Sequence, residues 1–223
     1  ELEAIERILQ KVNKDPEPDN IKSVEKETWQ LLYNAGKKGR RTGLGFTALA
    51  DTLAALNLKF DSDEAIAITE KIMKNKCEAE FNSSIDLAIE RGKFEVFDAT
   101  IDNTSEFIKM MKNELPEVYN RMMKFGRRNI SLSTVAPTGS ISILARSSSG
   151  IEPVFMLSYK RRKKVNPSDK NSRVDFTDAS GDSWQEYPVY HPALAQWMKI
   201  TGKKNIEESP YAHSTAGEIN WEK

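Results

Sequence analysis

The stretch Asn129-Ile-Ser-Leu-Ser-Thr-Val-Ala-Pro-Thr-Gly-Ser140 decides the fold predicted for this chain. Its β-branched, partly alternating half, from Ile130 to Val135, predicts a strand that ends at Pro137. The Pro-Thr-Gly-Ser turn that follows leads into a small-residue and apolar segment, Ile141 to Ala145, which predicts a helix start. A strand, a tight turn and a helix start in this order can present main-chain N–H groups to a phosphate.

Two interpretations of this turn stay open on the residues alone. Thr138 and Ser140 would add hydroxyl donors, and Gly139 would let an anion approach the main chain without a Cβ in the way. Pro-x-Gly-x is also ordinary turn chemistry, because Pro fixes φ and Gly tolerates positive φ. The turn by itself therefore does not establish a phosphate site.

Several blocks in a fixed order resemble the catalytic chain of ribonucleotide reductases, most closely the adenosylcobalamin-dependent (class II) group. The main block is Arg127 to Ser140, followed by Gly150-Ile-Glu-Pro153 and Tyr159-Lys-Arg-Arg162. Upstream, Gly39 to Asp51 and Asp61 to Ala65 match two further family blocks.

This resemblance implies a helix-dominated α/β fold that forms part of the second half of a ten-stranded α/β barrel. The intact family enzyme reduces a ribonucleoside di- or triphosphate to its 2′-deoxy form by radical chemistry that begins at adenosylcobalamin. Implied partners are the nucleotide substrate, the rest of the catalytic chain and a thioredoxin-type reductant. The family's Asn-x-Cys-x-Glu motif and its reducing cysteine pair do not occur here, so we assign no catalytic residue to this chain.

Two groups of site residues follow from the resemblance. The implied substrate-phosphate loop consists of Ala136, Pro137, Thr138, Gly139, Ser140, Ile141 and Ser142. The residues implied to line the site beside it are Gly150, Ile151, Glu152 and Pro153.

The chain is expected to be a fragment of a longer protein, with 1–223 as a partial catalytic barrel domain. Within it we distinguish a helical lead-in (1–38), a barrel core segment with the phosphate loop (39–159) and a final segment (160–223). The final segment holds a basic run, a polar excursion expected to be flexible (166–172) and an aromatic-rich helical end.

Composition limits the partners and the compartment. Lys plus Arg and Asp plus Glu both number 33, so no global charge attracts nucleic acid or a membrane. No apolar run approaches the ~18 residues of a transmembrane helix. A single cysteine, Cys77, suits a reducing compartment, and the cytoplasm is the expected location. Cys77 lies in an apolar stripe at helical spacing, which favours a structural thiol.

Local signals predict several helix boundaries. Ser23 is the expected N-cap of a helix that carries an apolar face and ends before Gly36. Gly43-Leu-Gly-Phe-Thr-Ala48 spells a dinucleotide pattern, but no hydrophobic strand precedes it, so a close-packed turn opening a helix from Phe46 is expected instead. Asp61-Ser-Asp-Glu64 resembles a capping box that opens the longest helix.

The alternative function belongs to another class. The basic run Lys160-Arg-Arg-Lys-Lys164 fits a non-catalytic helical module that binds an acidic partner. No aromatic residue interrupts the run, so base stacking on nucleic acid is not favoured. His191 and His213 have no further His or Cys at ligand spacing, so no metal site is predicted.

Overall fold

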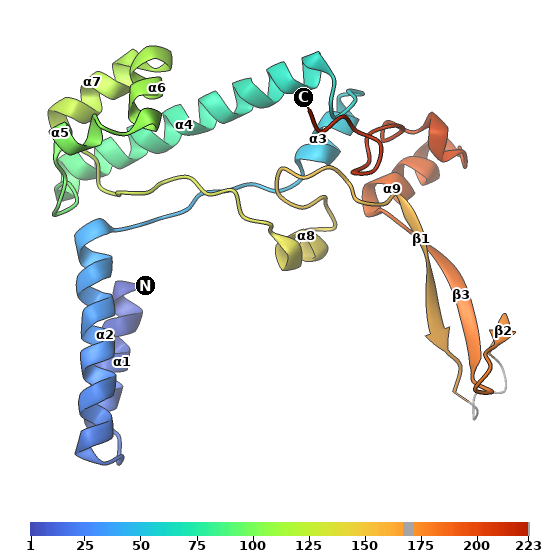
Figure 1. Ribbon diagram of the computed structural model, residues 1–223, viewed down its shortest axis with the longest axis horizontal. Coiled ribbons are helices and arrows are strands. Elements are labelled where there is room, and N and C mark those ends of the chain that lie inside the picture. The colour runs from blue at the N-terminus through green and yellow to red at the C-terminus, as the bar shows by residue number, and fades with distance from the viewer. Residues whose placement is uncertain (167–171, 223) are drawn as a thin grey trace. The chain divides into compact units, whose positions relative to one another are not determined.

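The computed structural model describes residues 1–166 and 172–222, and helices dominate it (Figure 1). The predicted helix-dominated α/β class is confirmed. The helices are α1 (Leu2–Lys14), α2 (Asp19–Gly39), α3 (Leu49–Ala55), α4 (Asp63–Arg91), α5 (Ala99–Asp102), α6 (Glu106–Glu114), α7 (Pro116–Phe125), α8 (Gly139–Ala145) and α9 (Pro192–Thr201), with a 3-10 turn at Ile206–Glu208. The strands are β1 (Ser158–Lys164), β2 (Phe176–Thr177) and β3 (Ser183–Tyr190).

The chain divides into two compact units. The first unit comprises Glu1–Gly45 and Lys71–Thr134, and the second comprises Phe46–Glu70 and Val135–Lys223. The segments predicted from sequence (1–38, 39–159 and 160–223) stay a prediction. None of the helices in the described part of the chain is long and apolar enough to cross a membrane.

Helices α1 and α2 form an antiparallel hairpin in the first unit (Figure 1). The Tyr33 hydroxyl of α2 donates a hydrogen bond of 2.7 Å to Oε1 of Glu6 in α1. A Cβ on Gly36 would lie 3.2 Å from the Leu2 side chain, so this glycine allows the helices to approach closely. Gly36 was therefore wrongly predicted to end α2, which continues to Gly39.

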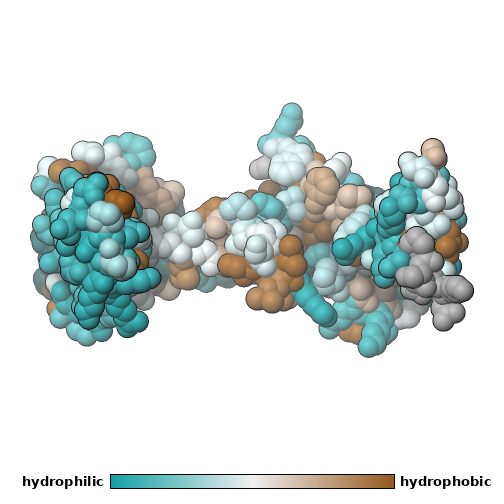
Figure 2. Space-filling view, turned by 90° about the horizontal axis from the view of Figure 1, so that it is seen from below, coloured by the Kyte–Doolittle hydropathy of each residue, from teal (hydrophilic) through white to brown (hydrophobic). Residues whose placement is uncertain are grey.

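The N-terminal end of α2 also differs from the prediction. The helix begins at Asp19, and Ser23 lies inside it, where its hydroxyl donates 2.8 Å to the Asn20 carbonyl. The predicted apolar face is exposed, with Val24 and Leu31 each 64% exposed, because α1 packs on the opposite face. Seen from below in Figure 2, this hairpin is covered mostly by hydrophilic side chains.

The core of the first unit forms where α4 meets α6 and α7. The buried side chains of this core are Phe81, Ile85, Ile108, Met111, Val118, Tyr119, Met122 and Leu132. Cys77 packs against them half-buried, and burial raises the pKa of its thiol. The apolar stripe predicted around Cys77 is thus confirmed where Phe81 and Ile85 follow it at intervals of four residues, whereas Ile89 at the next such interval is 54% exposed.

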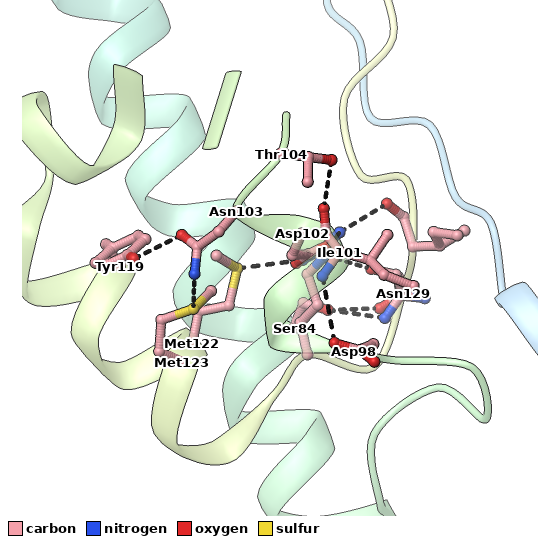
Figure 3. A network of polar contacts seen from close by, with 12 residues as sticks. Ser84, Asp98, Ile101, Asp102, Asn103, Thr104, Tyr119, Met122, Met123 and Asn129 are labelled. Atoms are coloured by element: carbon pink, nitrogen blue, oxygen red, sulfur yellow. Dashed lines mark hydrogen bonds and ion pairs between the residues drawn. The ribbon is translucent and has the colours of Figure 1, made fainter. Parts of the chain in front are cut away.

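A buried arginine fixes the start of the stretch Asn129–Ser140, next to the polar contacts of Ser84, Asp102 and Asn129 that Figure 3 shows. Arg127 is 5% exposed and pairs with the Asp102 carboxylate. Its guanidinium also donates 3.1 Å to the Asn129 carbonyl and lies 5.4 Å from the centre of the Phe94 ring. Beside it, the Ser84 hydroxyl donates 2.9 Å to Oδ1 of Asn129. These contacts pin residues 127–130 to α4 and α5.

The prediction of a strand from Ile130 to Val135 is wrong. Only Ser133 forms a bridge pair, in parallel with Leu44. Further main-chain bonds link the two segments, including Leu44 N–H to the Leu132 carbonyl at 2.7 Å. A Cβ on Gly43 would lie 3.1 Å from the Thr134 side chain, so the glycines serve this approach. The segment 43–45 is therefore extended, and the predicted turn there is also wrong.

The core of the second unit surrounds α3. Ala48 adopts a left-handed φ of 72° and delays the helix start to Leu49, three residues later than predicted. Leu49 and Leu53 pack with Ala65 of α4. The opposite side of α3 meets α9 and the C-terminal segment in a cluster of Ala50, Ala54, Val154, Leu157, Leu194 and Tyr211.

The start of α4 is capped one residue later than predicted. The Ser62 hydroxyl accepts the Ala65 N–H at 3.2 Å, which is the N-cap arrangement. Asp61 instead accepts the Asn220 N–H at 2.9 Å and so ties the C-terminal segment to this end of α4.

The three strands form a small antiparallel sheet in the order β1-β3-β2, with β1 at an edge. Ser158 pairs with Tyr190 at one end and Lys164 with Trp184 at the other. The basic run of the sequence is therefore strand β1. Of the excursion predicted to be flexible, residues 167–171 lie outside the described residues.

Candidate functional site

The second half of the stretch Asn129–Ser140 forms the predicted turn and the predicted helix start. Thr138 adopts a left-handed φ of 54°, and α8 begins at the next residue, Gly139. The first main-chain bond of the helix runs from Ser142 N–H to the Thr138 carbonyl at 2.8 Å. The turn therefore sits directly at the start of α8.

Three consecutive main-chain amides at this turn are open. In the described part of the chain, the N–H groups of Gly139, Ser140 and Ile141 have no hydrogen-bond acceptor. All three residues are exposed, and a Cβ on Gly139 would meet no atom within 4 Å. The Ser140 hydroxyl is exposed beside them, also without a partner among the described residues. An anion can reach these donors without displacing protein atoms.

Two of the hydroxyls in the implied loop serve the fold instead. Thr138 Oγ1 accepts the Gly150 N–H at 2.7 Å and lies 3.3 Å from Thr47 Oγ1. Ser142 is buried, and its hydroxyl donates 2.9 Å to the Gly139 carbonyl and lies 2.9 Å from Ser149 Oγ. Ala136 is half-buried, and Pro137 has no N–H to donate. The free donors are thus concentrated at residues 139–141.

The structure brings the block Gly150-Ile-Glu-Pro153 against this loop. Gly150 is buried, with φ of 42°, and a Cβ there would lie 2.9 Å from the Ala136 carbonyl oxygen. Glu152 and Ile151 are exposed, and the Glu152 N–H donates 3.0 Å to the Ser149 carbonyl in a tight turn. Only Gly150 of the four contacts the implied phosphate loop directly through a hydrogen bond.

We predict that Gly150→Ala destabilises the fold more than Gly181→Ala. Both glycines have positive φ, which costs a non-glycine residue about 1–2 kcal/mol. A Cβ on Gly181 meets no atom within 4 Å, whereas one on Gly150 must push the Ala136 carbonyl away. Chemical denaturation of the two variants measures the difference, and equal losses would show that the close approach at Gly150 is unimportant.

A cluster of polar groups around Asp51 was not predicted from the sequence. Asp51 Oδ1 lies 2.7 Å from His191 Nε2 and accepts the Tyr211 hydroxyl at 2.7 Å, while Oδ2 accepts the Ser148 N–H at 2.8 Å. Burial alone would raise the pKa of Asp51, but these hydrogen bonds hold it below its ordinary value. Burial and the neighbouring carboxylate raise the pKa of Tyr211.

A cavity of about 560 Å³ lies next to this centre. Its lining includes Ser147, Ser149, Glu152 and His191. The Ser147 hydroxyl is buried without a hydrogen-bond partner in the described structure. Polar groups thus line the cavity on the side of residues 147–152.

The comparison with protein families decides the identity of the fold. The family described as "Ribonucleotide reductase, barrel domain" matches residues 18–194. The chain belongs to this family. The resemblance found in the sequence blocks is thereby confirmed, and so is the assignment of the α/β fold to this barrel type.

Two vitamin B12-dependent reductases agree with the family match. The chain is 33% identical over 144 residues to a vitamin B12-dependent ribonucleoside-diphosphate reductase of Mycobacterium tuberculosis, covering 64% of this chain and 18% of the relative. A protein of the same description from Thermoplasma acidophilum is 33% identical over 206 residues, covering 91% of this chain and 24% of the relative. The solved class Id ribonucleotide reductase alpha subunit of Actinobacillus ureae aligns with a TM-score of 0.46 and 22% identity, over 78% of this chain and 24% of that chain. The chain thus spans 18% and 24% of the length of the two vitamin B12-dependent relatives.

Both histidines of the chain lie close to carboxylates. Of its two histidines, His191 is engaged with Asp51, and exposed His213 lies 3.8 Å from Glu207 Oε2. Within the described residues, no group of three or more His, Cys, Asp or Glu side chains is placed to hold a metal ion.

Proposed function

We propose that this chain is the substrate-phosphate segment of an adenosylcobalamin-dependent ribonucleoside-diphosphate reductase. The intact enzyme converts ribonucleotides to 2′-deoxyribonucleotides by radical chemistry in the cytoplasm, with a thioredoxin-type protein as reductant. The observation that carries the proposal is the set of open amides at Gly139, Ser140 and Ile141, inside the stretch that the barrel family matches. The names of the vitamin B12-dependent relatives support the choice of cofactor.

The role proposed for this segment is to hold the nucleotide's phosphates. The amides of residues 139–141 and the Ser140 hydroxyl would donate to the phosphate oxygens, and hydrogen bonds to charged groups are the stronger kind. Fixing a reactant in register can lower the barrier by about 7–11 kcal/mol at the upper limit. Ala136, Pro137, Thr138 and Ser142 would shape the loop, and Gly150 to Pro153 would support it from behind.

The radical chemistry is assigned to other parts of the enzyme. Cys77 is the only cysteine of the chain, and it is half-buried against the core of the first unit with a raised pKa. A thiol in this state is a poor nucleophile and redox group. It also lacks a second cysteine with which to supply two electrons.

We predict that the full-length protein reduces cytidine diphosphate to its deoxy form only when adenosylcobalamin is present. The 223-residue chain alone should show no turnover, because it lacks the reducing cysteines. Chromatography of the nucleotide products, with and without the cofactor, makes the measurement. Turnover by the isolated chain would contradict the division of roles. Full activity without the cofactor would contradict the assigned class.

The interaction-module alternative is not favoured. Three of the five cations in Lys160–Lys164 already form ion pairs on the sheet: Lys160 and Arg162 with Glu186, and Lys164 with Asp182 at 2.5 Å. A basic edge strand also protects a sheet against edge-to-edge aggregation. The charge of β1 is therefore explained without an acidic partner.

A further inference from the structure

We propose that Asp51 is a positioning residue for nucleotide binding, acting on the phosphate loop through Ser148, Gly150 and Thr138. This inference rests on the function proposed above for residues 139–141. Asp51 touches none of the open amides, and its effect on them is exerted through the main chain of neighbouring segments.

The first link joins Asp51 to Ser148 in both directions. Oδ2 of Asp51 accepts the Ser148 N–H at 2.8 Å, and the Asp51 N–H donates 3.3 Å to the Ser148 hydroxyl. Ser148 is 5% exposed, and its carbonyl accepts the Thr47 hydroxyl at 2.5 Å and the Ala48 N–H at 3.0 Å. Residue 148 is therefore held at four points by residues 47–51.

The second link continues from residue 148 to the phosphate loop. Two residues on, the Gly150 carbonyl accepts the Leu49 N–H at 3.3 Å. The Gly150 N–H donates 2.7 Å to Thr138 Oγ1, and this oxygen lies 3.3 Å from Thr47 Oγ1. Thr138 is the residue immediately before the open amides. The start of α3 thus holds both segments that flank the loop.

The third link fixes the Asp51 carboxylate itself. His191 and Tyr211 come from two distant parts of the chain, and both lie 2.7 Å from Oδ1. The His191 and Asp51 side chains are only 9% and 15% exposed. Since the pKa of Asp51 is low, the carboxylate is ionised at neutral pH and accepts all these bonds at once.

The conformation of Thr138 shows why these hydrogen bonds matter. A left-handed φ of 54° is unusual for a β-branched residue and persists only where surrounding contacts over-determine it. The Thr138 hydroxyl supplies those contacts through Gly150 and Thr47. Weakening the hydrogen bonds that run from Asp51 to Thr138 should let Thr138 leave this conformation. The next three amides would then no longer point to the same phosphate.

The test compares Asp51→Asn with Glu70→Gln in the full-length enzyme. Asn keeps the size of the side chain but presents an amide in place of the charged acceptor, whereas Glu70 is an exposed carboxylate on α4. We expect Asp51→Asn to raise the Kd for cytidine diphosphate about tenfold in equilibrium dialysis. The KM should rise in parallel, kcat at saturating substrate should change little, and Glu70→Gln should change none of these.

A second pair of variants decides the case if Asp51→Asn does not fold. Thr138→Val keeps the shape of the side chain but removes its hydroxyl, and Thr138→Ser retains the hydroxyl. The proposed positioning role predicts that Thr138→Val raises the Kd for cytidine diphosphate and that Thr138→Ser raises it less. Equal Kd values for these two variants would overturn the proposed positioning role.

The same measurements on Gly139→Val separate this inference from the proposed function. If Gly139→Val weakens nucleotide binding and Asp51→Asn does not, the positioning role is wrong and the phosphate loop remains. If neither variant changes the Kd, the loop itself does not bind the phosphates. A loss of kcat alone in Asp51→Asn, with the Kd unchanged, would also overturn the positioning role.

Discussion

Replacing Gly139 with valine should raise the KM of the full-length enzyme for its ribonucleotide about ten- to hundredfold. The branched side chain would stand where a phosphate must approach the open amides of residues 139–141. Losing one or two hydrogen bonds to a charged group costs about 1.5–3 kcal/mol each, and 1.4 kcal/mol is a factor of ten in affinity. Steady-state kinetics at varied nucleotide concentration measure the change.

The fold itself should tolerate this substitution. Gly139 has no positive φ, and a Cβ there meets no atom within 4 Å, so neither strain nor a clash is expected. Gly217 shares both properties in the same unit, which makes Gly217→Val a matched control. A KM that is the same in both variants would remove the phosphate role of the loop.

The parts of this site that depend on neighbouring residues could be predicted from sequence. Pro137 and Gly139 indicated a turn, the small apolar segment after it indicated a helix start, and the structure has both. The start of α7 at Pro116 has an equally local cause, because proline suits the first position of a helix. In these places the chain conformation follows from φ restrictions and missing donors that each residue carries with it.

Features that depend on distant partners could not be predicted in this way. Ile130 to Val135 has a strand-like composition, but its main-chain bonds to the segment 39–44 complete only one bridge pair, Leu44 with Ser133, and so no strand forms. Gly36 looked like a helix end, yet its lack of a side chain serves the contact with Leu2. Asp51 ends one of the blocks that resemble the family, but nothing near it indicated its hydrogen-bond partners, because these lie 97 to 160 positions along the chain. Only folding brings them together.

Replacing Arg127 with alanine should destabilise the protein by about 3–5 kcal/mol. The Arg127 and Asp102 side chains are only 6% and 16% exposed, so removing the cation leaves a carboxylate with little access to water. The variant also loses the donor to the Asn129 carbonyl and the contacts with the Phe81, Phe94 and Phe97 rings. Urea denaturation of the full-length protein, followed by a probe of the first unit, measures the loss.

Two comparisons separate the effect of breaking this buried ion pair from the effect of removing any arginine. Arg91→Ala removes an exposed ion pair, whose partners are 62% and 64% exposed, and should cost at most about 1 kcal/mol. The double variant Arg127→Met with Asp102→Leu removes both charges and should recover part of the loss, because no unpaired carboxylate remains. If the double variant is less stable than Arg127→Ala, the arginine acts mainly through its contacts with the rings and the main chain. The buried charge pair would then not be what holds residues 127–130 in place.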